Sequence, residues 1–236
     1  MIPKVIHYCW FGGKPLPRDV KKCIRSWKKY CPDYEIKRWD ESNFDVHQHS
    51  FCAAAYEAGA WAFVSDYARL KVVYDEGGIY LDTDVELIAS PAFLSEYQGY
   101  VAVDQSGHYV ASGLGFGAQK EHEVIERMLK IYDEVAFDNE NRASIACPLL
   151  NTRVLEELGY TYSDEIQTLN GIAVLPPAYC DPFAPGDSVD LLCDKTFSIH
   201  HYSASWTSTS QVWKRKLVRL VGQRRIVQIK NKLRRK

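Results

Sequence analysis

The N-terminal part of the chain has two patterns of apolar and polar positions, one typical of strands and one typical of a helix. Residues 5–10 (VIHYCW) form a short apolar run and residues 35–39 (EIKRW) alternate, both typical of strands. Between them, residues 19–30 place apolar and aromatic side chains at helical spacing. A strand, a helix and a strand in this order predict a βαβ unit with a parallel sheet.

The clearest pattern covers residues 65–87, SDYARLKVVYDEGGIYLDTDVEL. Its first part has helical spacing, and Ser65 or Asp66 is the expected N-cap. Gly77-Gly78 ends this helix, because glycine adopts left-handed backbone conformations without a Cβ clash. The buried strand 79–81 then runs directly into the sequence Asp-Thr-Asp.

Chain lengths place the start of this helix beside the end of the strand. A helix of about eleven residues rises about 16 Å, and four extended residues return about 13 Å. Asp66 and Arg69 should therefore lie near Asp82 and Asp84, at the carboxyl end of the strand, where open α/β sheets bind ligands.

Weaker patterns complete an α/β domain over residues 1–212, with a mixed, mainly parallel central sheet flanked by helices. The additional helices are expected at 51–56, 121–135 and 149–158, and the additional strands at 99–103, 111–118 and 172–175.

Charge separates residues 213–236 from the rest of the chain. The whole sequence has a net charge of −1, yet this segment has eleven Lys and Arg and no acids, which leaves 18 basic and 30 acidic side chains in residues 1–212. An acidic body disfavours nucleic acid as the main partner, since phosphate backbones bind basic surfaces.

The basic segment also has the pattern of an amphipathic helix. Trp213, Leu217, Leu220 and Val221 lie on one helical stripe with cations around it. Such a helix either binds an anionic membrane surface or stays solvated, and we expect the membrane-bound form. Residues 213–236 are therefore predicted as a separate, basic amphipathic C-terminal helix.

Cysteine usage and the N-terminus indicate a cytoplasmic protein. Seven cysteines without a CxxC pair fit neither a zinc site nor a disulfide framework. The N-terminus lacks the apolar run of a signal peptide, and no stretch approaches about 18 apolar residues. We expect the protein in the cytoplasm, held by its tail as a peripheral protein on the inner face of the cytoplasmic membrane.

Asp82 and Asp84 carry the strongest chemical signal. Two carboxylates one residue apart reach one hard divalent cation if the chain turns there, although a bare Asp-x-Asp is more often a solvated acidic turn. Beside a nucleotide-sugar donor, Mn²⁺ or Mg²⁺ would stabilise the charge that grows on the leaving diphosphate. Oxygen ligands with one imidazole suit Mn²⁺.

A second polar group lies in HHYSASW, residues 200–206. Either histidine of His200-His201 could complete a metal shell, although a lone histidine is more often structural. The Ser205 hydroxyl and the Trp206 indole N–H could donate hydrogen bonds to phosphate.

Three segments in this order, IPKVIHYCWFGG, residues 65–87 and HHYSASW, resemble the small DXD-motif sugar transferases of the Och1-like family, glycosyltransferase family 32. Bacterial members in capsule and exopolysaccharide synthesis look most similar. The pattern is also similar to the catalytic domain of the clostridial glucosylating toxins and, more distantly, to the neisserial lipooligosaccharide galactosyltransferase. The resemblance spans residues 2–206 and implies a GT-A-type nucleotide-binding fold that transfers sugar with retention of configuration.

The resemblance also implies roles for single residues. Trp10 matches a tryptophan that stacks on uracil, and Asp66 and Arg69 match residues that contact the donor sugar and its diphosphate. Asp82 and Asp84 match the metal-binding carboxylates.

The remaining candidate residues match functional residues of the relatives less consistently. His201 matches a metal-ligating histidine of the galactosyltransferase, whereas Ser205 and Trp206 match a phosphate-binding S-x-W of the toxins only loosely. Thr83, between the two carboxylates, is a further candidate for donor contact. Many relatives carry Thr-Gly-Pro where residues 146–148 are Ala-Cys-Pro, so the resemblance assigns no acceptor-side residues.

Together these observations predict a metal-dependent, retaining hexosyltransferase. We expect a UDP-sugar donor ahead of GDP-mannose, and a saccharide acceptor, lipid-linked, in surface polysaccharide synthesis. One alternative is a haloacid-dehalogenase-like phosphatase, in which a strand also precedes Asp-x-Asp, but near the N-terminus and with Gly-Thr in place of Val85-Glu86. A second alternative is a non-catalytic carbohydrate-binding protein that keeps the cleft.

Overall fold

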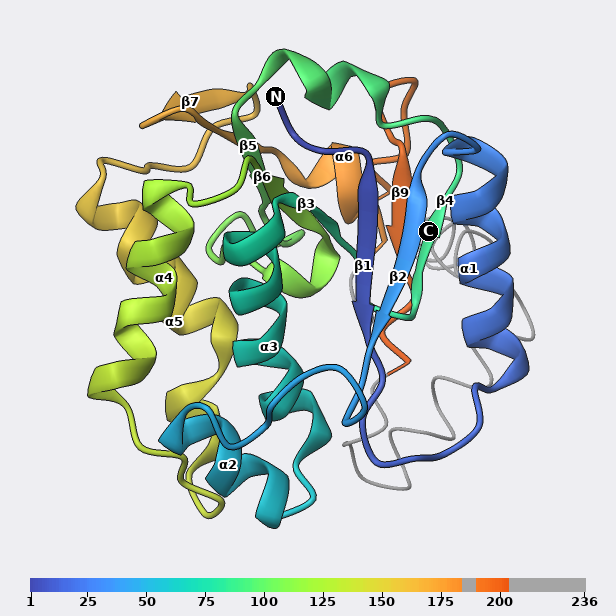
Figure 1. Cartoon of the computed structure of the whole chain (residues 1–236). Coiled ribbons are helices and arrows are strands. Elements are labelled where there is room, and N and C mark those ends of the chain that lie inside the picture. The colour runs from blue at the N-terminus through green and yellow to red at the C-terminus, as the bar shows by residue number, and fades with distance from the viewer. Residues whose placement is uncertain (184–189, 204–236) are drawn as a thin grey trace, which may run out of the picture.

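A computed structural model describes residues 1–183 and 190–203 of the chain, and every structural statement below concerns these residues. Figure 1 shows a sheet with helices on both sides. In chain order the elements are β1 (Val5–Cys9), α1 (Arg18–Tyr30), β2 (Glu35–Trp39), α2 (Ser50–Glu57), α3 (Trp61–Glu76), β3 (Gly78–Tyr80), β4 (Val85–Leu87), the 3₁₀ helix η1 (Ala92–Glu96), β5 (Gly99–Ala102), η2 (Ser112–Leu114), β6 (Phe116–Ala118), α4 (Glu123–Glu134), η3 (Arg142–Ile145), α5 (Cys147–Glu157), β7 (Gln167–Leu169), β8 (Ile172–Leu175), α6 (Pro177–Cys180) and β9 (Ser198–His200).

The main sheet of the described chain has seven strands in the order β2-β1-β3-β6-β5-β8-β7. Five strands run in one direction, while β6 and β7 run against their neighbours. A separate two-stranded ribbon pairs β4 with β9. The prediction of a mixed, mainly parallel sheet flanked by helices is confirmed.

Alternating side chains of the strands fill two cores, one on each face of the sheet. In β3 and just after it, Ile79 and Leu81 pack into one core and Tyr80 packs into the other. The Tyr80 core is closed by α2, α3, α4 and α5, which gather on one side in Figure 1. The opposite core is closed by α1, α6 and the β4–β9 ribbon.

The structure corrects several predicted boundaries. Helix α3 begins at Trp61, so Asp66 lies inside the helix and does not cap it. The strand expected at 111–118 is a 3₁₀ turn followed by the short β6, because the backbone bends there toward the end of β3. Three short strands, β4, β7 and β9, have no periodic signal of their own in the sequence.

Two further observations concern cysteines and membranes. All seven cysteines are free thiols, and six of them are buried, so the described chain contains no disulfide. No helix within the described ranges is long and apolar enough to span a bilayer. The predicted basic helix at 213–236, and with it the proposed domain boundary, lies outside the described residues.

Candidate active site

The Asp-Thr-Asp turn follows β3 directly. Leu81 still belongs to the sheet, since its amide donates a hydrogen bond to the His7 carbonyl oxygen at 3.1 Å. The chain then turns, and the Val85 amide donates to the Asp82 carbonyl oxygen at 2.9 Å before β4 begins. Asp82 and Asp84 therefore lie at the carboxyl end of a parallel strand, as the sequence predicted.

Helix α3 brings a buried ion-pair network to this turn. The Arg69 guanidinium nitrogen Nη2 lies 2.9 Å from Asp66 Oδ1 and 3.3 Å from Asp82 Oδ1. Both helix residues are almost fully buried, Arg69 being 4% exposed and Asp66 8%. A buried charge without a partner is strongly destabilising, so the three groups hold one another in place. The predicted proximity of Asp66 and Arg69 to Asp82 is confirmed.

Further contacts fix the direction of the Arg69 side chain. Its Nε donates to the Ser65 carbonyl oxygen at 3.0 Å, and its Nη1 donates to Ser112 Oγ at 3.4 Å. The guanidinium carbon lies 5.1 Å from the centre of the Tyr80 ring, whose hydroxyl donates to Asp82 Oδ1 at 3.0 Å. Arg69 is thus a preorganised cation at the edge of the turn.

The β4–β9 ribbon supplies a third candidate ligand. Val85 pairs with His200 across the ribbon, and His200 Nε2 lies 3.0 Å from Asp84 Oδ1. One ligand atom from each of Asp82, Asp84 and His200 lies within 4.8 Å of the other two. Two carboxylates and one imidazole at this separation fit a divalent cation such as Mn²⁺.

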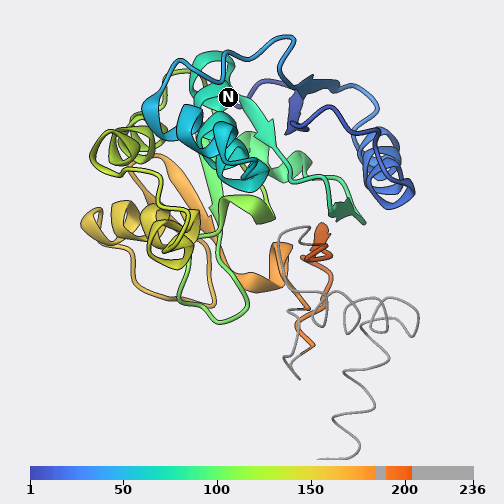
Figure 2. The same cartoon turned by 90° about the horizontal axis from the view of Figure 1, so that it is seen from below.

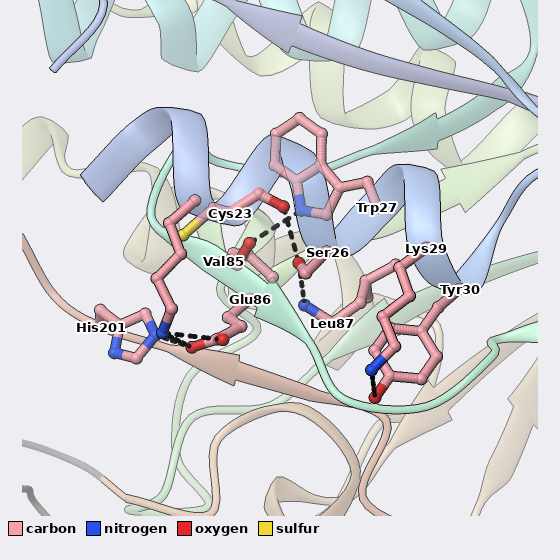
Figure 3. Close-up of polar contacts among 10 residues, drawn as sticks. Cys23, Ser26, Trp27, Lys29, Tyr30, Val85, Glu86, Leu87 and His201 are labelled. Atoms are coloured by element: carbon pink, nitrogen blue, oxygen red, sulfur yellow. Dashed lines mark hydrogen bonds and ion pairs between the residues drawn. The ribbon is translucent and has the colours of Figure 1, made fainter. Parts of the chain in front are cut away.

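His201, the histidine that the resemblance indicated, is directed elsewhere. Its Nε2 lies 2.8 Å from Glu86 Oε2 on β4, as Figure 3 shows. Successive side chains of a strand point to opposite faces, so only one of two adjacent histidines can reach the turn. The structure brings His200, and not His201, to Asp82 and Asp84.

Burial and neighbouring charges set the ionisation of this group. Burial raises the pKa of Asp82; Arg69 opposes this shift, and Asp84 adds to it. Burial alone would also raise the pKa of Asp84, but His200 holds it well below its usual range. Burial acts against the charged form of His200, yet the Asp84 carboxylate raises the pKa of that imidazole to about 9. A metal ion would therefore compete with a proton for His200.

These side chains line one end of a cavity of about 790 Å³. The carboxylates, Arg69 and His200 form its charged end. The rest of the wall is mainly apolar, with Phe63, Tyr109 and Leu149 among its residues, but it also includes the charged residues Asp104 and Arg142. The volume is in the range of small-molecule sites. A charged end beside an apolar wall can hold a ligand that has an anionic part and a less polar part.

Gly113, which lines the cavity, and Ser112, which contacts Arg69, were not identified from the sequence. A Cβ atom on Gly113 would lie 2.6 Å from Asp82 Oδ2, so only glycine lets the backbone approach this carboxylate. The neighbouring Ser112 hydroxyl contacts the Cys147 sulfur at 3.6 Å. Glycines inside a strand-like pattern signal such close approaches, and this was the available clue in residues 111–118.

Tyr202 packs against His200 and is itself held by Asp181. The Tyr202 ring centre lies 4.1 Å from that of His200, and its hydroxyl donates to Asp181 Oδ2 at 2.6 Å. Asp181 is fully buried. Groups that orient a ligating histidine in this way influence metal affinity, and no sequence pattern distinguishes them.

The other predicted residues have different positions. Trp10, at the end of β1, is partly buried and donates from Nε1 to the Lys14 carbonyl oxygen at 2.6 Å; the cavity lining does not include it. Thr83 is a half-buried residue of the turn. Ser205 and Trp206 lie outside the described residues.

Comparison with known proteins gives one family match. Residues 17–100, which include the Asp-Thr-Asp turn, match the family described as the glycosyltransferase sugar-binding region containing a DXD motif. The chain carries a DXD-motif glycosyltransferase region. No match was found among curated proteins.

Solved glycosyltransferases have similar structures. The PaToxG glycosyltransferase aligns with 66% of this chain and 68% of its own, at 20% identity and a TM-score of 0.52, which shows the fold. The galactosyltransferase LgtC, solved with donor and acceptor sugar analogues, aligns over 90% of this chain and 92% of its own, at 15% identity and a TM-score of 0.45. A glycosyltransferase involved in glycosylation of the major capsid of PBCV-1 covers 90% of this chain and 99% of its own, at 12% identity and a TM-score of 0.45.

Proposed function

We propose that this DXD glycosyltransferase is metal-dependent and transfers a hexose from a nucleotide sugar, a UDP-sugar in the first place, to a saccharide acceptor. The convergence of Asp82, Asp84 and His200 within 4.8 Å, beside a buried arginine and at the end of a cavity, carries the proposal. A solvated acidic turn, the plain alternative, would need neither the buried guanidinium nor the imidazole.

Each side chain of the site has a defined task in this proposal. A divalent cation held by Asp82, Asp84 and His200 would supply Lewis-acid stabilisation for the leaving diphosphate. Arg69 directs fixed positive charge toward the same end of the cavity, where the departing phosphate gains negative charge. Asp66 fixes the guanidinium and offers its remaining acceptor capacity to a sugar hydroxyl.

The finer expectations belong to the same proposal. Retention of configuration and an α-linked product are proposed on the family resemblance. A lipid-linked acceptor, a role in surface polysaccharide synthesis and a position on the inner face of the cytoplasmic membrane are proposed from the resemblance and from the eleven cations of residues 213–236. Trp10, Thr83, Ser205 and Trp206 remain candidates for nucleotide and phosphate contacts.

Isothermal calorimetry tests the donor and metal assignments together. UDP and GDP are titrated with and without Mn²⁺ into the wild type and into Asp84→Ala. The expected result is Mn²⁺-dependent binding of UDP that the substitution abolishes. Binding of neither nucleotide by the folded protein would contradict the proposal.

Two alternative functions predict different results. The family match and the fold favour sugar transfer over the haloacid-dehalogenase-like phosphatase, which would act on phosphate esters and release phosphate. A non-catalytic carbohydrate-binding protein would bind sugars without consuming the donor. Hydrolysis of UDP-sugars in the presence of Mn²⁺, followed as release of UDP, separates an enzyme from such a binding protein.

A further inference from the structure

Helix α1 concentrates the positive charge of the described chain. It carries six cations, Arg18, Lys21, Lys22, Arg25, Lys28 and Lys29, and a single acid, Asp19. All six are exposed. The whole of residues 1–212 has only 18 basic side chains against 30 acidic ones, so one third of its cations lie on this one helix.

The cations share one face of the helix. At 3.6 residues per turn they fall within an arc of about 120°. The opposite face buries Val20, Cys23 and Trp27 in the core of the domain, and the Trp27 indole N–H donates to the Val85 carbonyl oxygen at 2.8 Å (Figure 3). The packing therefore fixes the cationic face outward.

Helix stability does not account for this arrangement. Lys28 and Lys29 lie in the last turn, where cations interact favourably with the helix dipole. Arg18, Lys21 and Arg25, by contrast, stand three or four residues from one another, and like charges at that spacing repel.

In helix α4 of the same protein, cations are paired with acidic residues one turn away. There Arg127 Nη2 lies within 2.5 Å of Glu123 Oε1, and Lys130 Nζ lies 2.7 Å from Glu126 Oε1, each four residues apart. The cations of α4 are thus paired along the helix. On α1, Lys22 pairs with Glu86 of β4 at 2.9 Å, whereas Arg18, Lys21, Arg25 and Lys28 form a row of like charges. A row of this kind is stabilised by an anionic partner.

The position of α1 indicates the shape of that partner. The helix lies at the outer edge of the molecule in both orientations, away from α2–α5 (Figures 1 and 2). Its 13 residues make a convex cationic strip about 20 Å long. A convex strip of cations suits a flat anionic surface.

We propose that the outer face of α1, defined by Arg18, Lys21, Arg25 and Lys28, docks the enzyme on an anionic lipid bilayer. None of these four residues lines the cavity of the proposed sugar-transfer site. Docking through α1 would hold the body of the protein in a fixed orientation on the bilayer.

Vesicle co-sedimentation of the full chain tests the proposal. The variant Lys21→Glu/Arg25→Glu/Lys28→Glu is compared with a matched control, Arg127→Glu/Lys130→Glu/Arg153→Glu, which makes the same charge change on α4 and α5. Vesicles are phosphatidylcholine alone or phosphatidylcholine with phosphatidylglycerol, at low and high salt, and circular dichroism verifies the fold of each variant.

The α1 variant should lose at least about tenfold in partition onto the anionic vesicles, because each cation close to an anionic leaflet contributes about fivefold. The control should lose less than about threefold, and binding of the wild type should weaken at high salt. Equal loss in both variants, unchanged binding of the α1 variant, equal binding of the wild type to neutral vesicles, or tighter binding to duplex DNA would each overturn the proposal. No donor or metal enters the assay, so its failure and that of the sugar-transfer proposal are distinguishable.

Discussion

At the scale of single residues, the candidate metal site depends on a difference of one position. His200 and His201 are adjacent, but His200 Nε2 lies 3.0 Å from Asp84 Oδ1 whereas His201 Nε2 lies 2.8 Å from Glu86 Oε2. The two imidazoles therefore have separate tasks. His200 faces the cavity, and His201 fastens β9 to β4.

Substitution of each histidine separates these tasks. We expect His200→Ala to weaken Mn²⁺ binding at least about tenfold, since it removes a ligand. His201→Ala should change it less than about threefold and lower mainly the stability of the ribbon. Titration of free Mn²⁺ by electron paramagnetic resonance, with UDP present, measures both. If His201→Ala weakened Mn²⁺ binding more than His200→Ala does, His201 would be the metal ligand instead.

A buried histidine outside the site makes stability depend on pH. The Trp39 indole N–H donates to His7 Nδ1 at 3.0 Å, so Nε2 carries the proton and donates to the Gly77 carbonyl oxygen at 2.7 Å. Burial lowers the pKa of His7 below its ordinary value of 6.5. Because the unfolded chain takes up this proton first, the contribution of His7 to stability is complete above pH 6.5 and is lost as the pH falls toward the folded-state pKa.

The variant His7→Gln should therefore remove part of the acid sensitivity. Between pH 7.5 and 5, the free energy of unfolding of the wild type should fall more steeply, by up to about 1.4 kcal/mol per pH unit for one proton. Urea denaturation at several pH values measures the difference. If the free energy of unfolding changed equally with pH in the two proteins, His7 would not be the cause of the acid sensitivity.

At the scale of elements, one glycine joins α3 to β3. Gly77 has a φ of 70°, and a Cβ there would lie 2.8 Å from the Lys120 amide nitrogen and 2.8 Å from Pro3 Cγ. The positive φ, which glycine adopts without a Cβ clash, ends the helix. Because Gly77 has no side chain, the segments around Pro3 and Lys120 can pack against the junction. This short connection places Arg69 and Asp82 at the same end of the sheet.

Gly13 offers a matched control for the junction. It has a similar φ of 65°, but a Cβ there would meet nothing within 4 Å. Gly13→Ala should cost about 1–2 kcal/mol for the left-handed backbone, and Gly77→Ala should cost about 1–3 kcal/mol more because of steric overlap. Denaturant unfolding measures both values, and equal losses would mean that the packing at Gly77 relaxes without penalty.

At the scale of the whole molecule, the cavity combines distant parts of the chain. α3, the turn after β3, η2, the start of α5 and β9 all contribute to its wall. A ligand that bridges them favours the folded state over the unfolded one. Stability should therefore report on occupancy of the site.

Thermal unfolding should show this coupling. UDP with Mn²⁺ at about 100 times the dissociation constant contributes about 2.7 kcal/mol, which for a protein of this size raises Tm by about 5–10 °C. A chelator should return Tm to the value of the unliganded protein, and UDP without metal should raise it less. A shift that persists after chelation would contradict metal-mediated binding.

The sequence by itself determined the local part of this architecture. Helical spacing before Gly77-Gly78 and a short apolar strand after it predicted that Arg69 would approach Asp82, because both elements are contiguous in the chain and their lengths follow from fixed rises per residue. The seven unpaired thiols and the mainly parallel sheet were likewise predicted. The approach of Arg69 to Asp82 in particular depends only on neighbouring elements of the sequence.

Only the tertiary structure decided which distant residues meet. Glu86 and His201 are 115 positions apart, and β4 and β9 are too short to show a period, so no pattern in the sequence sets their register. A shift of one residue in that register moves a side chain to the other face of the ribbon. The choice of His200 over His201, and the approach of Gly113 to Asp82, therefore follow from long-range packing.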